Sequence, residues 1–320
     1  MDYVILGREL VRALRGRRSQ AALSRRLGFK TNVLYTWESG RCSPPIGEFL
    51  RFATKVGVSL EHAVRDFYRA QPEWWSSECA EPRHLAFRLL NDQRRQVPLV
   101  QLVRATGFSR FALRRWFADE AEPRLFEFLN VLDACSRRLL DFLATLVDPS
   151  SLPSVRDNWH ALSLARHAAY QSPWSHAVLR VLETQDYKSL ASHQQGWIAK
   201  RLGISAAEET ECLDLLDRSR QISLSQGRWQ PVDRSAVDLR AGHAAAKALA
   251  AWWVNTAAVR AKSSPGMFAY NVCGVAERDL DRIQTLQVDF LKQVRAVVAE
   301  SEPVERVALV AVQIFALDEP

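Results

Sequence analysis

The stretch that decides the fold of the N-terminal part of the chain is residues 19–40, SQAALSRRLGFKTNVLYTWESG. Its spacing predicts two short helices joined by a tight turn. Leu23 and Leu27 are four residues apart, so they share one face of the first helix. Leu34 and Trp37 are three residues apart and give the second helix its buried side. A short second helix set across the first is the geometry that enters a DNA major groove.

Glycine and proline residues mark the ends of both predicted helices. Gly28 follows the last apolar residue of the first helix, where a glycine in the left-handed conformation ends a helix at low cost, and Gly40 closes the second helix. Pro44 and Pro45 prevent the second helix from continuing. Both helices are therefore expected to be short.

This pattern resembles the Xre/Cro-like helix-turn-helix domain of phage repressors and many bacterial regulators. The resemblance covers about the first seventy residues and includes residues 56–60, VGVSL, which match the start of the family's fifth helix. It implies that Gln20 binds a DNA phosphate, that the second helix faces base edges, and that flanking residues contact the DNA backbone. The positions that it implies for DNA contact are Gln20, Lys30, Thr31, Asn32, Tyr35, Thr36 and Arg41.

The positive charge of the chain lies in the same part of the sequence. Residues 1–70 hold 13 Lys and Arg and 6 Asp and Glu, a net charge of +7, which equals that of the whole chain. Residues 71–150 hold 11 of each sign, and the remainder holds 19 of each. Binding of DNA phosphates requires such a local excess of cations. A basic surface that binds another protein is the alternative interpretation.

Residues 71–150 repeat the first unit at a constant offset of 79 and without a gap. Most of the coinciding positions are apolar or turn positions, so the pattern indicates one fold built twice. The pairs include Leu6/Leu85, Leu10/Leu89, Leu23/Leu102, Gly28/Gly107, Phe29/Phe108, Leu34/Leu113, Trp37/Trp116, Pro44/Pro123, Phe49/Phe128 and Leu60/Leu139.

The function of this second repeat is open at the level of sequence. Its expected recognition helix is residues 109–116, where Arg110, Arg114 and Arg115 could contact phosphates or guanines. However, the repeat is net neutral, and Leu99 replaces the glutamine of the phosphate-contact position. A second DNA reader and a packing or dimerisation unit are equally compatible with these residues.

The C-terminal half is expected to begin after a linker at residues 148–155 and to contain two further units. Three helices and a hairpin predict a winged helix, over residues 174–183, 194–202, 206–218, 222–224 and 229–232. Its would-be recognition helix is acidic, so this unit is expected to be structural or dimerising. A small α/β unit follows, with helices over 236–261 and 277–300 and strands over 268–275 and 304–317.

Residues 156–318 also resemble a bacterial regulator family that joins an N-terminal helix-turn-helix to a domain of unknown function. The marker of the resemblance is the terminal run QIFAL, residues 313–317, although the family usually has proline where Ala316 stands. The resemblance implies transcriptional regulation and supplies neither a ligand nor catalytic residues.

The remaining composition argues against several classes of protein. No run of about 18 apolar residues is present, so no membrane span is expected. The five cysteines are far apart and the seven histidines are scattered, so neither a disulfide framework nor a metal site is indicated. There is no glycine-rich phosphate loop and no nucleophile motif. We expect no enzymatic activity, no cofactor and a cytoplasmic location.

The sequence therefore predicts a mainly α chain with tandem Xre-like helix-turn-helix units, a winged helix and a small C-terminal α/β unit. The expected domains are residues 1–70, 71–150, 151–234 and 235–320. We expect a sequence-specific regulator, most simply a repressor, that binds double-stranded DNA as a homodimer. The C-terminal unit would dimerise or take an effector or protein partner. The alternative is an antitoxin-like or defence-associated interaction module that only autoregulates through its N-terminal domain.

Overall fold

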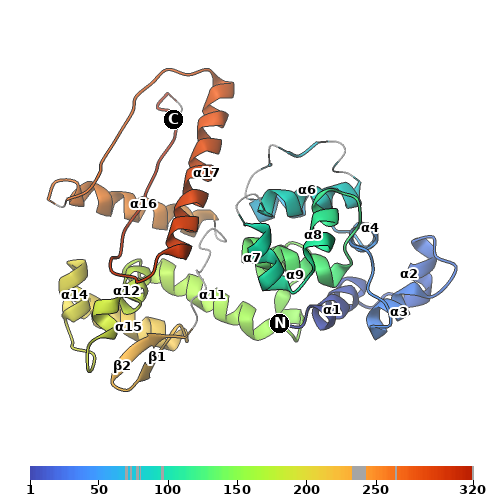
Figure 1. The fold of residues 1–320 in the computed structure, drawn as a ribbon, viewed down its shortest axis with the longest axis horizontal. Helices are drawn as coiled ribbons and strands as arrows, with labels where there is room; N and C mark the ends of the chain where they lie inside the picture. Colours follow the sequence, from blue (N-terminus) through green and yellow to red (C-terminus); the bar gives the residue numbers. More distant parts are fainter. Residues whose placement is uncertain are drawn as a thin grey trace. The chain divides into compact units, whose positions relative to one another are not determined.

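The computed structural model describes residues 1–68, 71–72, 74–76, 79, 81–94, 97–232, 243–263 and 265–318. The chain divides into two compact units, Met1–His160 and Ala161–Pro320, and each is treated by itself. Helices dominate both units, and the described residues contain a single two-stranded sheet (Figure 1). The predicted mainly α class is confirmed. No helix in the described part of the chain is long and apolar enough to cross a membrane.

The first unit consists of ten helices and one 3₁₀ turn in its described residues. Helices of the first repeat are α1 (Tyr3–Arg15), α2 (Gln20–Arg26), α3 (Val33–Ser39), α4 (Ile46–Lys55) and α5 (Leu60–Tyr68). Those of the second are α6 (Pro82–Arg94), α7 (Leu99–Thr106), α8 (Arg110–Phe117), α9 (Leu125–Ser136) and α10 (Leu139–Ala144). Because α6 starts and ends 79 residues after α1, the structure confirms the predicted duplication.

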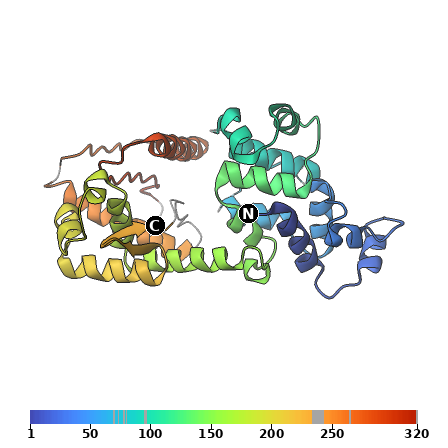
Figure 2. The ribbon, with the colours of Figure 1, turned by 60° about the horizontal axis from the view of Figure 1, so that its bottom comes forward.

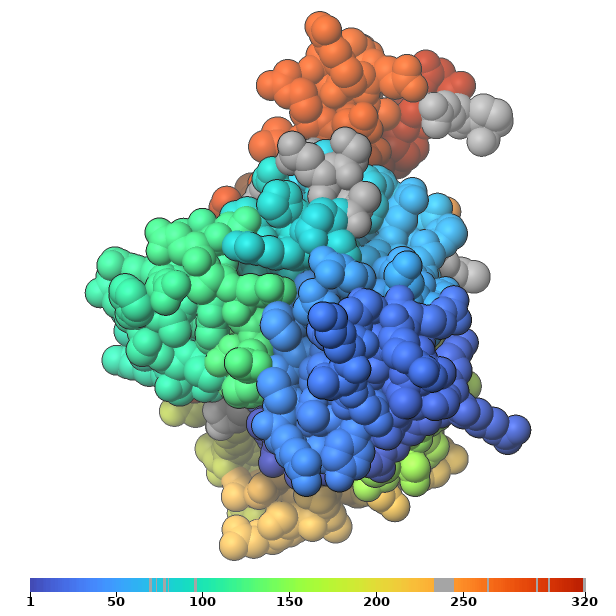
Figure 3. All heavy atoms as spheres, turned by 90° about the vertical axis from the view of Figure 1, so that its right-hand side faces the viewer, coloured from blue at the N-terminus to red at the C-terminus, as the bar shows by residue number. Residues whose placement is uncertain are grey.

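The two repeats share one hydrophobic core. Helix α1 packs against α9, and α4 packs against α6, so each repeat is covered by a helix of the other. The contact is close enough that a Cβ atom on Gly7 of α1 would lie 3.4 Å from Leu125 of α9. Figure 3 shows the blue residues of the first repeat beside the green residues of the second.

Backbone hydrogen bonds between the repeats are reciprocal. The Ile46 amide donates to the Pro123 carbonyl at 3.0 Å, and the Leu125 amide donates to the Pro44 carbonyl at 2.8 Å. Leu125 stands 79 positions after Ile46, and Pro123 stands 79 positions after Pro44. Equivalent residues thus exchange equivalent bonds, as in an interface related by a two-fold axis.

The segment 148–155 is part of the first unit. It contains the 3₁₀ turn η2 (Pro149–Ser151), and both Leu152 and Val155 are fully buried in the core. The Ser154 hydroxyl donates to the Glu9 carboxylate at 2.6 Å. The predicted linker is packed against the repeats, because two apolar side chains hold the segment there.

The second unit contains the predicted three helices and hairpin. Along the chain it comprises α11 (Arg156–Gln171, which begins in the first unit), α12 (Trp174–Leu182), α13 (Gln185–Lys188), α14 (Trp197–Leu202), α15 (Ala206–Arg218), β1 (Ile222–Ser225), β2 (Arg228–Pro231), α16 (His243–Arg260) and α17 (Glu277–Glu300). The strands are antiparallel, and Ile222 is paired with Pro231. Figure 2 shows the hairpin beside α15. A capping box of Ser205 and Glu208 starts α15.

The predicted strands at 268–275 and 304–317 are absent, so the small α/β unit is not formed in the described residues. A strand needs a neighbouring strand for its backbone groups, and no other strand in the described part of this unit pairs with them. The carbonyl of Val304 instead accepts from the Gln185 amide, and that of Val312 accepts from Gln287. Helix α17 agrees with its prediction, whereas residues 236–242 of the expected Ala-rich helix lie outside the described residues.

Candidate nucleic-acid interface

Local hydrogen bonds fix the turn between α2 and α3. Ser19 caps α2, and Asn32 caps α3 by accepting from the Tyr35 amide at 3.4 Å. Between them, the buried Ser24 hydroxyl accepts from the Leu34 amide at 3.2 Å and donates to the Asn32 side-chain oxygen at 3.3 Å. The spacing of apolar residues did not reveal Ser24. Its signal is a small hydroxyl residue directly after a core leucine, facing the start of the next helix.

Glu38 is a buried carboxylate that ties α1 and α2 to α3. Its oxygens accept from the Arg15 guanidinium at 2.5 and 3.1 Å, and only 5% of its side chain is exposed. The hydrogen bond to Glu38 raises the pKa of Arg15. The Gln20 amide also donates to this carboxylate, at 2.8 Å. Gln20, which was expected to bind phosphate, therefore helps to hold α2 against α3 in this structure.

The exposed side of the helix-turn-helix carries the other predicted contact residues. Lys30, Thr31 and Arg41 are exposed, and the Arg41 guanidinium carbon lies 5.3 Å from the centre of the Tyr35 ring, which is 46% exposed. The Thr36 hydroxyl donates to the Val33 carbonyl at 2.7 Å. The structure thus brings the predicted residues together around one short helix.

Asn32 has a structural role in the turn. Its side-chain oxygen accepts from the Tyr35 amide and the Ser24 hydroxyl, so it is used to build the turn. A bidentate contact with adenine requires both the oxygen and the nitrogen of an asparagine side chain. In this conformation Asn32 is first a helix cap.

The second repeat presents an arginine-rich counterpart of α3. Arg110, Arg114 and Arg115 of α8 are all exposed, and Phe111 among them is 70% exposed. The guanidinium carbon of Arg115 lies 5.6 Å from the centre of the Phe111 ring. The helix therefore carries cations and an apolar ring on its solvent side.

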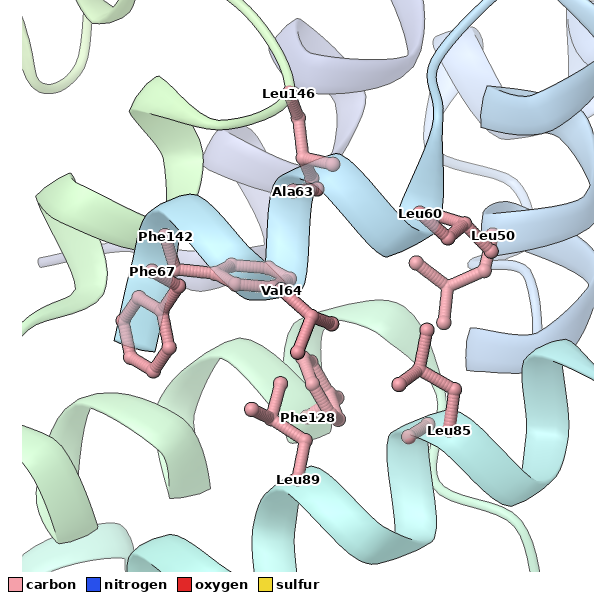
Figure 4. Close-up of a pocket in the computed structure, with 11 residues that line it drawn as sticks. Leu50, Leu60, Ala63, Val64, Phe67, Leu85, Leu89, Phe128, Phe142 and Leu146 are labelled. Carbon is pink, nitrogen blue, oxygen red and sulfur yellow. The ribbon is translucent and has the colours of Figure 1, made fainter. Parts of the chain in front are cut away.

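The described residues contain no metal cluster, and the cavity between the repeats is small. No group of three His, Cys, Asp or Glu residues could hold a metal ion in the part of the chain that the structure describes. A cavity of about 20 Å³ lies in the core between the repeats (Figure 4), lined entirely by apolar residues such as Leu50, Phe67 and Phe142. A cavity of this size has room for about one water molecule, which needs roughly 10–15 Å³ on the same measure, and it is too small for an effector.

Comparison with known families agrees with the two-part organisation. Residues 5–66 match a helix-turn-helix domain, and residues 155–317 match a domain of unknown function, DUF4423. No curated protein and no solved structure matched the chain. The helix-turn-helix match covers α2 and α3 and ends before the second repeat. The match of residues 155–317 covers half of the chain, so the chain belongs to the family defined by the domain of unknown function DUF4423.

Proposed function

We propose that this protein is a sequence-specific transcriptional repressor that reads double-stranded DNA with helix α3. The observation that carries the proposal is the two-sided character of α3. Leu34 and Trp37 are buried in the core, while Tyr35 and the preceding Thr31 are exposed, in the part of the chain that holds the excess of positive charge. The match of residues 5–66 to a helix-turn-helix domain supports the same use.

The chemistry of the exposed side suits a major groove. Hydroxyl groups of Thr31, Tyr35 and Thr36 can bond base edges, while Lys30 and Arg41 neutralise phosphates on either side. The basic surface supplies most of the affinity for any DNA, and the hydroxyl groups supply preference among sequences. On this proposal the protein acts by binding and needs no cofactor.

A second copy of the chain would complete the C-terminal half. The extended segments after α16 leave Met267, Tyr270, Phe315 and Leu317 between 69 and 96% exposed. Their burial against a second copy would be favourable at about 25 cal/mol per Å² and would place two N-terminal units on one operator. Light scattering of the full-length protein should give the mass of a dimer. A monomer mass at micromolar concentration would refute this part.

DNA binding is tested with the full-length protein and a pool of duplexes that carry a randomised central stretch. The selected duplex should bind tightly, and replacing Thr31 and Tyr35 by alanine should weaken that binding by about 10-fold or more for each lost base contact. The same variant should bind an unselected duplex almost as the wild type does. The matched control is His62→Ala, an exposed change on α5 outside the turn.

Two results would overturn the proposal. Failure of the wild-type protein to enrich any sequence would show that it does not read DNA. Equal losses on selected and unselected duplexes would show that α3 contacts only the backbone. A reporter gene placed behind the selected sequence then tests repression, and increased expression in the presence of the protein would refute the repressor role.

A further inference from the structure

The first unit is built like a symmetric dimer that has been joined into one chain. Its repeats are offset by 79 residues, exchange equivalent backbone bonds through Ile46 and Leu125, and cover one another with α1 and α6. In symmetric DNA-binding dimers, the same relation places one recognition helix on each half-site. The equivalent of α3 in the second repeat is α8.

Two of the core contacts that hold α3 recur around α8. The rings of Phe108 and Trp116 meet edge to face at 5.2 Å, as the rings of Phe29 and Trp37 do at 5.9 Å. Leu113, like its equivalent in α3, is fully buried. The orientation of α8 within its own repeat is therefore that of α3, and the side that α3 exposes is also exposed in α8.

One buried contact has been exchanged for another without loss of the arrangement. Arg15 binds Glu38 in the first repeat, whereas the equivalent Arg94 lies over the ring of Phe117 with its guanidinium carbon 4.4 Å from the ring centre. Both contacts join the first helix of a repeat to the end of its third. The second repeat lacks an equivalent of Glu38, but the contact of Arg94 with Phe117 still joins α6 to α8.

The exposed side of α8 has the chemistry of base recognition. Arginine binds the O6 and N7 atoms of guanine through two hydrogen bonds, and phenylalanine packs against the methyl group of thymine. Arg110, Phe111, Arg114 and Arg115 supply both kinds of group at the positions equivalent to Thr31, Asn32, Tyr35 and Thr36.

The acidic neighbours of α8 reduce its net charge but do not cover these arginines. The Asp119 carboxylate is bound to the Arg83 guanidinium at 3.1 and 3.2 Å, so its charge is paired. Glu120 is exposed and stands at the position equivalent to Arg41. The second repeat should thus bind DNA less strongly than the first and depend more on its base contacts.

We infer that α8 is a second DNA-reading helix, and that a single chain reads two unlike half-sites. This inference rests on the proposed function. The half-site of α3 is read mainly through hydroxyl groups, and that of α8 contains guanine and thymine. An exposed face for assembly with another protein is the competing use of Phe111, and the test separates the two.

The test compares two triple variants of the full-length protein that lose the same charge. One replaces Arg110, Arg114 and Arg115 with alanine, and the control replaces the exposed arginines Arg65, Arg218 and Arg278. Both bind duplexes selected by the wild type from a pool with a randomised stretch of about 30 base pairs, or about three helical turns. Affinity is measured over a series of salt concentrations, and mass is measured by light scattering.

The α8 variant should lose about 100-fold or more in affinity for the selected duplex, and the slope of log affinity against log salt should become shallower by about 1–3. Hydroxyl-radical footprints should lose the segments that α8 protects and keep those that α3 protects. The control variant should keep all of them. Phe111→Ala should remove the preference for thymine while leaving the salt slope unchanged.

Three outcomes lead to different conclusions. If the wild type selects a sequence and the α8 variant binds it as the control does, the inference is wrong and the proposed function stands. If the α8 variant keeps its salt slope but changes its mass, α8 serves assembly, which also overturns the inference. If the wild type selects no sequence, the proposed function itself has failed.

Discussion

Replacing Glu38 with glutamine tests what holds α1, α2 and α3 together. The change keeps the size of the side chain but removes the charge that Arg15 meets at 2.5 Å. Removing one partner of a fully buried ion pair costs about 3–5 kcal/mol. Arg15 is 19% exposed, and it also donates to the carbonyls of Gly16 and Arg18 at 2.8 Å, so it keeps some partners. We therefore expect the free energy of unfolding of the first unit to fall by about 2 kcal/mol.

The assay is urea unfolding of the full-length protein, combined with hydrogen exchange of peptides from α1 and α3. Protection of both helices should fall together, because the same carboxylate joins them. Glu61→Gln, an exposed change on α5, is the control and should stay within about 0.5 kcal/mol of the wild type. A Glu38→Gln variant as stable as that control would refute the view that this carboxylate organises the helix-turn-helix.

Two further predictions concern backbone strain and pH. Gly28 and Gly40 have φ of +89° and +80°, so alanine at each should cost about 1 kcal/mol in urea unfolding, and Gly40→Ala should cost more because its Cβ would lie 3.1 Å from the Arg8 side chain. Equal losses would mean that Arg8 yields freely. Burial and the nearby charge of Arg180 lower the pKa of His176 to about 4, so the unfolded chain takes up a proton at about 6.5 and the folded chain does not. Stability of the second unit should fall by about 2 kcal/mol as pH falls from 6.5 to 4, and hydrogen exchange of α12 should lose this dependence in His176→Asn; an unchanged pH profile would contradict it.

Helices were predicted well because their signals are local. The apolar spacing of α2 and α3 and the glycines Gly28 and Gly40 lie within a few positions of the helices that they define. The same pattern recurs at a constant offset of 79 residues, and this repetition predicted α6 and α8.

The predicted C-terminal strands failed for the opposite reason. The apolar run at 304–317 shows that these side chains favour burial, but a strand also needs a neighbour elsewhere in the chain or in another copy. No spacing within the run says which neighbour that is. Without a neighbouring strand, Phe315 and Leu317 stay exposed.

The sequence placed the candidate contact residues around one turn but did not show which of them build that turn. Spacing places Asn32 on the exposed side of the turn, and it is exposed. Whether such a residue caps a helix or reads a base depends on where the helix begins, which spacing fixes only to within a few residues. Because α3 begins at Val33, Asn32 is its N-cap. Gln20 donates its side-chain hydrogen bond to Glu38.

The packing of α1 against α9 also sets the order of events during synthesis of the chain. About 110 residues separate the end of α1 at Arg15 from the start of α9 at Leu125. At about 5–20 residues per second, a ribosome needs roughly 5–22 s to make them. During that interval the apolar face of α1 lacks the helix that covers it, so nascent chains are open to aggregation or to chaperones. The first helix-turn-helix gains its final support only when the second repeat has been translated.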